Sequence, residues 1–349
     1  MTDAKGWGEE YAKLRGYVAA HPEIVLTKTE ISIPQPVREG FYRIFDEVRK
    51  AVAAAHLDAL PLKARTLSER YARVEKEAAA LLGVERIGMP IDLDVFLHDP
   101  EAGLVRPVYT PLFDLLQGKM SEGEFALQAG ANIAAAAQEL FRLGYERWAG
   151  LELVKALEPE ESFFVDLDED FKPYLRELET VSFGKQSHHP TMRIPEFVVR
   201  SRRFQKLVAV KMALAVEIDE YYVPFKPAVK PKKRTGDTSF ALDSRAVLLS
   251  FLEDEKKIPV YADIFECTRT PPDWLVEYAV GDPEALSGAL GRLSRHLEIL
   301  GPKMGGRLIV LGDAPDLPGL AAALPDGVEL LAPDFDAGRL EAALPAGLA

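Results

Sequence analysis

The sequence predicts an α+β protein of mixed topology, with a mostly α-helical N-terminal region and a C-terminal α/β domain that contains a mixed sheet. Amphipathic helical patterns dominate the first half of the 349-residue chain, a proline- and lysine-rich segment follows, and strand-like and helix-like segments then alternate. We therefore expect a helical domain over residues 1–200, a connecting segment with a basic Pro/Lys linker over 201–236, and an α/β domain over 237–349.

Two helices are expected early in the N-terminal region. The first, Val37 to Leu57, follows Pro36 and spaces its apolar residues along one face. The second, Thr66 to Leu82, opens with a Thr66–Glu69 capping box and closes at Gly83, a residue that often terminates helices. Both segments therefore have start signals as well as an apolar face.

A third, longer helix is expected after a capping box formed by Ser121 and Glu124, with an apolar stripe that continues to Trp148. Two other segments are ambiguous. Met89 to Tyr109 is rich in proline and reads as either a hairpin or a long connection, and the apolar run Leu207 to Ile218 is either a buried helix or a strand pair. Periodicity does not decide between these alternatives.

The C-terminal part alternates in type. Ala246 to Leu252 and Ile258 to Thr268 are expected to form an antiparallel pair of strands, and an amphipathic helix follows over Glu284 to Leu300. The remaining elements are expected to be strands at Arg307–Leu311 and Val328–Leu331, with helices at Leu317–Leu324 and Ala337–Leu344. Helices between strands imply right-handed crossovers and a sheet covered by helices.

Composition narrows the class of protein. The formal net charge is −13, which argues against a broadly basic nucleic-acid-binding surface but leaves room for a local basic groove. The single cysteine, Cys267, has no partner for an intramolecular disulfide, as is typical of the reducing cytoplasm. The N-terminus lacks the apolar core of a signal peptide, and no run approaches the length of a membrane span. We therefore expect a cytoplasmic protein that does not enter a membrane.

A candidate metal site lies on the expected strand Ile258 to Thr268. Glu266 stands late on this apolar strand, where a carboxylate is costly to bury unless it is paired, protonated or bound to a cation. Asp243, at the start of the preceding strand, is the natural second carboxylate. Two carboxylates on neighbouring strands can hold Mg²⁺ or Mn²⁺ and leave positions for water and phosphate.

The segment from 241 to 312 resembles the core of the PD-(D/E)XK nuclease superfamily, in which an acidic residue and a turn precede a strand with Glu-x-Lys, then a helix and another strand. Asp243 matches the first acid and Glu266 the second, while Thr268 stands where the lysine is expected. The resemblance implies a restriction-endonuclease-like fold and metal-dependent cleavage of nucleic acid, with Arg269 contacting phosphate. The Pro-Asp pair of the family is absent before Asp243.

Other basic residues can substitute for the missing lysine, namely Lys256 or Lys257 in the turn and Arg292 or Arg295 on the following helix. The alternative is structural: Asp243 is then a turn residue, and Glu266 pairs with a nearby arginine. In that case the α/β domain is a scaffold, and the protein acts by binding another protein rather than by catalysis.

The linker concentrates positive charge on an otherwise acidic chain. Lys230, Lys232, Lys233 and Arg234 lie within it, and a second basic group, Arg200 to Lys206, precedes the apolar run. These residues either contact the phosphate backbone of DNA or RNA or keep a loop solvated. Contacts of the first kind are expected to be sensitive to salt and blind to sequence.

Overall fold

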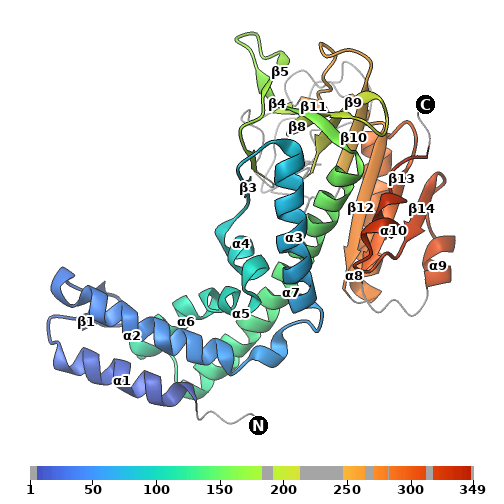
Figure 1. The fold of residues 1–349 in the computed structure, drawn as a ribbon. Coiled ribbons are helices and arrows are strands. Elements are labelled where there is room, and N and C mark those ends of the chain that lie inside the picture. Colours follow the sequence, from blue (N-terminus) through green and yellow to red (C-terminus); the bar gives the residue numbers. More distant parts are fainter. Residues whose placement is uncertain are drawn as a thin grey trace, which may run out of the picture. The chain divides into compact units, whose positions relative to one another are not determined.

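A computed structural model describes residues 6–182, 192–212, 247–263, 270–281, 283–311 and 317–346 (Figure 1). The chain forms two compact units, the first made of Met1–Ala72 and Pro90–Gly144, and the second of Arg73–Met89 and Tyr145–Ala349. The first unit is mostly helical, and the second is built on a sheet. The α+β fold class, with a helical N-terminal region and a sheet in the C-terminal part, is confirmed.

The first unit packs helices around one hydrophobic core. Its elements are α1 (Trp7–Ala20), β1 (Val25–Leu26), β2 (Ile31–Ser32), α2 (Gln35–Ala54), α4 (Ile91–His98), α5 (Pro100–Gly103), α6 (Tyr109–Leu116), and the N-terminal parts of α3 (Ala64–Leu82) and α7 (Glu122–Ala156). None of the helices in the described ranges combines the length and the apolar composition that crossing a membrane requires.

The expected start signals account for α2 and α7. Pro36 lies in the first turn of α2, and the inner face of the helix buries Val37, Phe41, Phe45, Val48 and Val52, with Ile44 partly buried. At the start of α7, the Ser121 N–H donates to Glu124 Oε2 at 2.7 Å, and the Glu124 N–H donates to Ser121 Oγ at 3.3 Å. This reciprocal pair is the predicted capping box.

Two other expectations about the helices need correction. Helix α3 begins at Ala64, so Thr66 lies inside it and does not cap it, although Gly83 does follow its end with a φ of +70°. The segment Met89–Tyr109 is neither a hairpin nor an extended connection, because it contains α4 and α5. Asp99 caps α5 by accepting from two backbone N–H groups, and Pro100 occupies the first helical position, where proline is tolerated.

The second unit contains an eight-stranded mixed sheet in the order β14-β13-β12-β10-β9-β8-β4-β5. Strands β12, β13 and β14 are parallel, and the other neighbours are antiparallel. The strands are β4 (Pro159–Leu167), β5 (Pro173–Glu177), β8 (Phe197–Ser201), β9 (Lys206–Lys211), β10 (Val247–Leu252), β12 (Trp274–Val280), β13 (Gly306–Leu311) and β14 (Val328–Leu331).

Helices connect the parallel strands, as the sequence predicts. Helix α8 (Pro283–Leu300) joins β12 to β13, α9 (Leu317–Ala322) lies between β13 and β14, and α10 (Ala337–Glu341) follows β14. Two short sheets complete the unit, one pairing β3 (Ile87–Gly88) with β6 (Val181–Ser182) and the other pairing β7 (Met192–Arg193) with β11 (Ala262–Asp263).

The prediction that residues 246–252 pair with residues 258–268 as antiparallel strands is wrong. Strand β10 pairs with β9 and β12, while β11 is the described strand within 258–268 and it pairs with β7. Strand β12 was not predicted from the sequence, and its seven residues are all buried between β10 and β13. The run Leu207–Ile218 is a strand as far as Lys211, where β9 ends.

Both faces of the sheet are covered next to β12. Leu275 and Ala279 point toward α8 and share a hydrophobic core with its apolar residues. Tyr278 points the opposite way, toward Gly150 of α7, where an added Cβ would lie 3.8 Å from the Tyr278 hydroxyl. Trp274 on that same face donates its Nε1–H to the Ala343 carbonyl at 2.8 Å. The sheet is therefore a buried layer on which polar side chains need internal partners.

Candidate functional site

The residues that the sequence singles out for catalysis lie outside the described ranges. These residues are Asp243, Glu266 and Arg269, and the basic linker residues Lys230, Lys232, Lys233 and Arg234 lie outside them too. The expected Mg²⁺ or Mn²⁺ site and the expected contact with nucleic acid therefore stay predictions. The elements that flank them are present, since β10, α8 and β13 form where the sequence places them.

A buried acidic and basic pair stands on the β8–β9 hairpin. Glu196 follows Pro195 directly before β8, and Lys211 is the last residue of β9. The Glu196 N–H donates to the Val210 carbonyl at 2.9 Å, which places Glu196 across from Lys211. Their side chains meet with 2.9 Å between Lys211 Nζ and Glu196 Oε1. The Lys211 side chain is only 2% exposed and that of Glu196 is 11% exposed.

Both oxygens of Glu196 are engaged by donors from the protein. The second oxygen of Glu196, Oε2, accepts a hydrogen bond from the Met212 N–H. Each carboxylate oxygen thus has one donor from the protein, and the ammonium neutralises the charge. Removing one member of a buried pair leaves the other charge uncompensated and costs about 3–5 kcal/mol. Such a pair is costly to maintain, which makes it a candidate for function rather than for stability alone.

Hydroxyl groups lie beside the pair on the same face of the sheet. Ala209 shares the face of Lys211, and Ser250 of β10 lies opposite Ala209. Ser250 Oγ is 3.1 Å from the hydroxyl of Tyr261, which is fully buried. Burial raises the pKa of Tyr261. The Ser250 hydrogen bond lowers this pKa, and the negative charges of Glu196 and Asp273 raise it. The Tyr261 phenol therefore stays neutral at physiological pH.

Asp273, at the start of β12, is occupied by structural contacts. Its Oδ2 accepts from the Phe251 N–H at 2.7 Å, and its Oδ1 accepts from Lys303 Nζ at 2.9 Å. Its own N–H donates to the Leu249 carbonyl at 2.9 Å. The bonds to Phe251 and Leu249 join the end of β10 to the residue before β12, and the bond from Lys303 engages the other carboxylate oxygen.

A second buried polar cluster joins β12 to α8. Glu277 and His296 are completely buried, and His296 Nδ1 lies 2.7 Å from Glu277 Oε2. Arg292 contributes its Nε at 3.4 Å from Glu277 Oε1 and also donates to the Tyr278 carbonyl at 3.3 Å. Among the residues that the structure describes, none provides a hydrogen-bond partner for the buried His296 Nε2. Arg292 is therefore committed to Glu277, which weakens its assignment as the substitute for the missing lysine.

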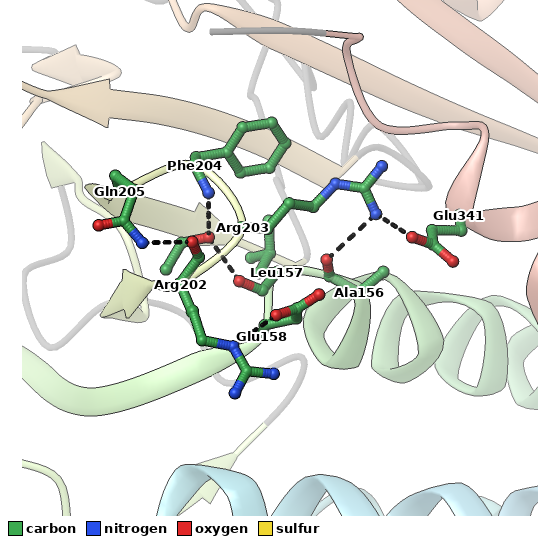
Figure 2. A network of polar contacts seen from close by, with 9 residues as sticks. Ala156, Leu157, Glu158, Arg202, Arg203, Phe204, Gln205 and Glu341 are labelled. Carbon is green, nitrogen blue, oxygen red and sulfur yellow. Dashed lines mark hydrogen bonds and ion pairs between the residues drawn. The ribbon is translucent and has the colours of Figure 1, made fainter. Parts of the chain in front are cut away.

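The three arginines of the basic group Arg200 to Lys206 each pair with a carboxylate, and two of them are drawn in Figure 2. Arg202 Nε lies 2.7 Å from Glu158 Oε2, and Arg203 pairs with Glu341 of α10. In the same group, Arg200 bonds Glu161 at 2.6 Å and Glu255 at 3.2 Å. Since each guanidinium already faces a carboxylate, these arginines do not offer free positive charge to a phosphate backbone.

The same hairpin turn closes the C-terminal end of α7. Ser201 donates its hydroxyl proton to the Leu157 carbonyl. Arg203 donates to the Ala156 carbonyl at 3.5 Å (Figure 2). The last carbonyls of a helix have no intrahelical partners, and a cation is favourable there. The turn thereby anchors the β8–β9 hairpin, and with it Glu196 and Lys211, to the end of a long helix.

Sequence reasoning missed both members of the buried pair. Two signals point to them: Pro195-Glu196 opens an apolar strand, and Lys211 is the lone charge in the apolar stretch from Leu207 to Val216. The acid and the lysine stand 15 residues apart in the chain, so their meeting depends on the β8–β9 register.

Comparison with known proteins identifies no relative. No model of a protein family matches this chain, and no curated protein or solved structure matches it. The chemistry of the buried pair and of its surroundings is therefore the basis for assigning a function.

Proposed function

We propose that the protein is a nuclease-like, nucleic-acid-processing protein whose centre includes Glu196 and Lys211. The observation that carries the proposal is the direct 2.9 Å contact of these two buried side chains on adjacent strands. In the family that residues 241–312 resemble, a Pro-acid pair precedes a strand that ends in acid-x-Lys. Pro195-Glu196 followed by Ala209-Val210-Lys211 agrees with that pattern at the first acid and at the lysine.

Each residue has a defined role in this proposal. The Lys211 ammonium stabilises the negative charge that develops on a phosphodiester during attack by water, because a fixed cation in a site shielded from water acts strongly on such charge. Glu196 holds Lys211 in place through its Oε1. Ser201 and Arg203 act as positioning residues, since they anchor the hairpin that carries the pair.

Around the Glu196–Lys211 pair, the described residues do not complete a site for Mg²⁺ or Mn²⁺. A hard divalent cation takes about six oxygen ligands and usually one or two carboxylates. Here Glu196 is the one carboxylate beside Lys211, both of its oxygens accept from protein donors, and Ala209 stands where the pattern has an acid. The further carboxylate is proposed to come from Asp243 or Glu266, which lie outside the described ranges.

Ala209 and the internal satisfaction of Glu196 favour a second candidate function. In this alternative the centre is degenerate, and the protein is a non-catalytic scaffold that binds a partner through the same α/β core. The Lys211 ammonium then takes the place of a metal ion, and its positive charge balances the negative charge of Glu196. The two candidates differ in whether the centre binds a metal and cleaves nucleic acid.

The test is a calorimetric Mn²⁺ titration of the full chain, followed by cleavage assays on DNA and RNA. The variants are Glu196→Gln, Glu266→Ala and Lys211→Arg, and Lys206→Arg is the matched control because Lys206 is exposed on the same strand. For a catalytic centre, we expect Mn²⁺ binding that Glu196→Gln and Glu266→Ala abolish. Cleavage should fall about 10²-fold or more in Lys211→Arg and stay unchanged in Lys206→Arg.

The other outcomes separate the candidates. Nucleic-acid binding without metal binding or cleavage supports the non-catalytic alternative, and metal binding without cleavage contradicts a catalytic centre. Absence of both metal binding and nucleic-acid binding contradicts the nuclease-like proposal and leaves a protein–protein scaffold. Circular dichroism of each variant shows whether a loss reflects unfolding of the second unit.

A further inference from the structure

The β4–β5 hairpin is a strongly acidic edge of the eight-stranded sheet. Nine carboxylates and two basic residues lie between Glu158 and Glu179, a net charge of −7 in a chain whose total is −13. Strand β5 ends the sheet, and β4 is the strand that pairs with it among the described residues (Figure 1). Arg202 pairs with Glu158 and Arg200 pairs with Glu161, so these two carboxylates do not add to the negative charge of the β5 edge.

Both cations of this hairpin are neutralised within it. Arg176 Nε lies 3.0 Å from Asp166 Oδ2 and its guanidinium lies 4.4 Å from the centre of the Phe164 ring, while Lys172 pairs with Asp170 at 3.2 Å. The acidic residues Glu177 and Glu179 at the end of β5 are exposed. The surface that remains is therefore negative, with no internal cation left to cancel it.

The backbone of β5 offers hydrogen-bonding groups on its outer side. The Asp168 N–H donates to the Lys172 carbonyl at 3.0 Å, so this pair is a hydrogen-bonded pair of the antiparallel ladder. Such pairs alternate with pairs whose backbone groups point away from each other. In the β4–β5 register, Leu175 and Glu177 belong to the second kind, so their N–H and C=O groups point outward. These groups are a template for one more strand.

The side chains at this edge fit a strand of a particular chemistry. Tyr174 is 44% exposed and Phe171 in the adjoining turn is 57% exposed, which provides apolar surface beside the charges. A second copy of this chain fits this edge poorly, because it would bring its own acidic β5 edge against the same carboxylates. Like charges across paired strands are destabilising. A segment with alternating basic and apolar residues fits the outward backbone groups, the aromatic surface and the charge.

We propose that the outer edge of β5 binds an extended, basic segment of a partner protein, which adds to the sheet as a ninth strand. The backbone of Leu175 and Glu177 supplies the hydrogen bonds, and the acidic residues select a basic partner. This proposal is independent of the function of the Glu196–Lys211 pair.

The test measures binding of a fluorescent peptide to the full chain, with anisotropy as the readout. The probe is an alternating Lys-Val peptide of about nine residues, the length of a long strand. The control probe has the same sequence with N-methyl groups on alternate residues, which removes its donors along one side. We expect the first peptide to bind at low salt and the control to bind about tenfold more weakly or not at all.

Two pairs of variants separate backbone pairing from charge attraction. Leu175→Pro removes an outward N–H, while Leu175→Ala removes the side chain and keeps that donor. Glu177→Lys with Glu179→Lys reverses the edge charge, and Glu284→Lys with Glu298→Lys changes two exposed acidic residues of α8 equally. We expect about a tenfold loss of affinity for Leu175→Pro relative to Leu175→Ala, and a similar loss for the edge reversal relative to its control.

Hydrogen exchange provides a direct check of the wild-type protein. Peptide binding should slow exchange at the amides of Leu175 and Glu177. The proposal is overturned if neither peptide binds, if both peptides bind equally, or if the edge reversal and the α8 reversal have the same effect. Equal binding by Leu175→Pro and Leu175→Ala would also refute strand addition, because the attraction would then be electrostatic only.

Discussion

Replacing Lys211 by methionine tests the central physical claim about the candidate site. The substitution keeps the length and apolar character of the side chain but removes the ammonium that lies 2.9 Å from Glu196 Oε1. Because Glu196 is only 11% exposed, its carboxylate would keep the Met212 N–H as a donor but would lose its counter-charge. Breaking a buried pair in this way is expected to lower the free energy of unfolding by about 3–5 kcal/mol.

A double variant distinguishes loss of the charge pair from loss of packing. Glu196→Gln combined with Lys211→Met removes both charges and keeps an amide oxygen that can accept from Met212. We expect the double variant to regain most of the free energy of unfolding that Lys211→Met loses. The double-mutant cycle would then give an interaction energy opposite in sign to the losses of the single variants. Lys206→Met on the exposed end of the same strand is the matched control, with a change within about 0.5 kcal/mol.

Urea denaturation, followed by tryptophan fluorescence and circular dichroism, measures these differences. Trp148 and Trp274 report on the second unit, and Trp7 reports on the first. A loss below about 1 kcal/mol for Lys211→Met would refute the argument, because an exposed pair contributes that little. Failure of the double variant to recover stability would show that the side chain of Lys211, and not its charge, is what the fold requires.

Two further predictions concern backbone packing and pH. An added Cβ at Gly306 would lie 2.4 Å from the Leu275 carbonyl oxygen, so Gly306→Ala is expected to lower the free energy of unfolding by about 1–3 kcal/mol. An added Cβ at Gly291 on α8 meets no described atom within 4 Å, so Gly291→Ala should raise the free energy of unfolding by about 1 kcal/mol in the same urea assay. Hydrogen bonds from Ser121 lower the pKa of Glu124, so the carboxylate contributes stability above its unfolded pKa. The wild type should have a higher free energy of unfolding than Glu124→Gln at about pH 7, and this difference should be lost as pH falls through the lowered pKa of Glu124. A difference in the free energy of unfolding that does not change with pH would contradict this prediction.

The parts of the fold that local patterns determine could be predicted from the sequence. Helices α2, α7 and α8 have amphipathic faces, and α7 also has a capping box, so each carries its own signal. Strands β13 and β14 are short apolar runs between helical segments, which favours parallel strands. These elements depend on contacts between neighbours in the chain or on the burial of one face.

Pairing between distant strands could not be read from local patterns. The apolar run of β12 contains Glu277, a residue that argues against a buried strand until His296 and Arg292 of α8 supply its partners. In the same way, Ile258 to Thr268 is apolar enough for a central strand, but the place beside β10 belongs to β12. The sheet also joins β4, β5, β8 and β9 to the strands beyond residue 246, a register that depends on long-range contacts.

The position of the candidate site follows from how the β8–β9 hairpin is held. A slip of one residue between β8 and β9 would turn Lys211 to the other face of the sheet and separate it from Glu196. The turn of this hairpin resists such a slip, because the Ser201 hydroxyl donates to the Leu157 carbonyl and accepts from the Phe204 N–H at 3.2 Å (Figure 2). The contacts of Arg203 with Ala156 and Glu341 add a second attachment to α7 and α10. Substitution of Ser201 by alanine should therefore weaken the contact between Glu196 and Lys211, although it changes neither of these residues.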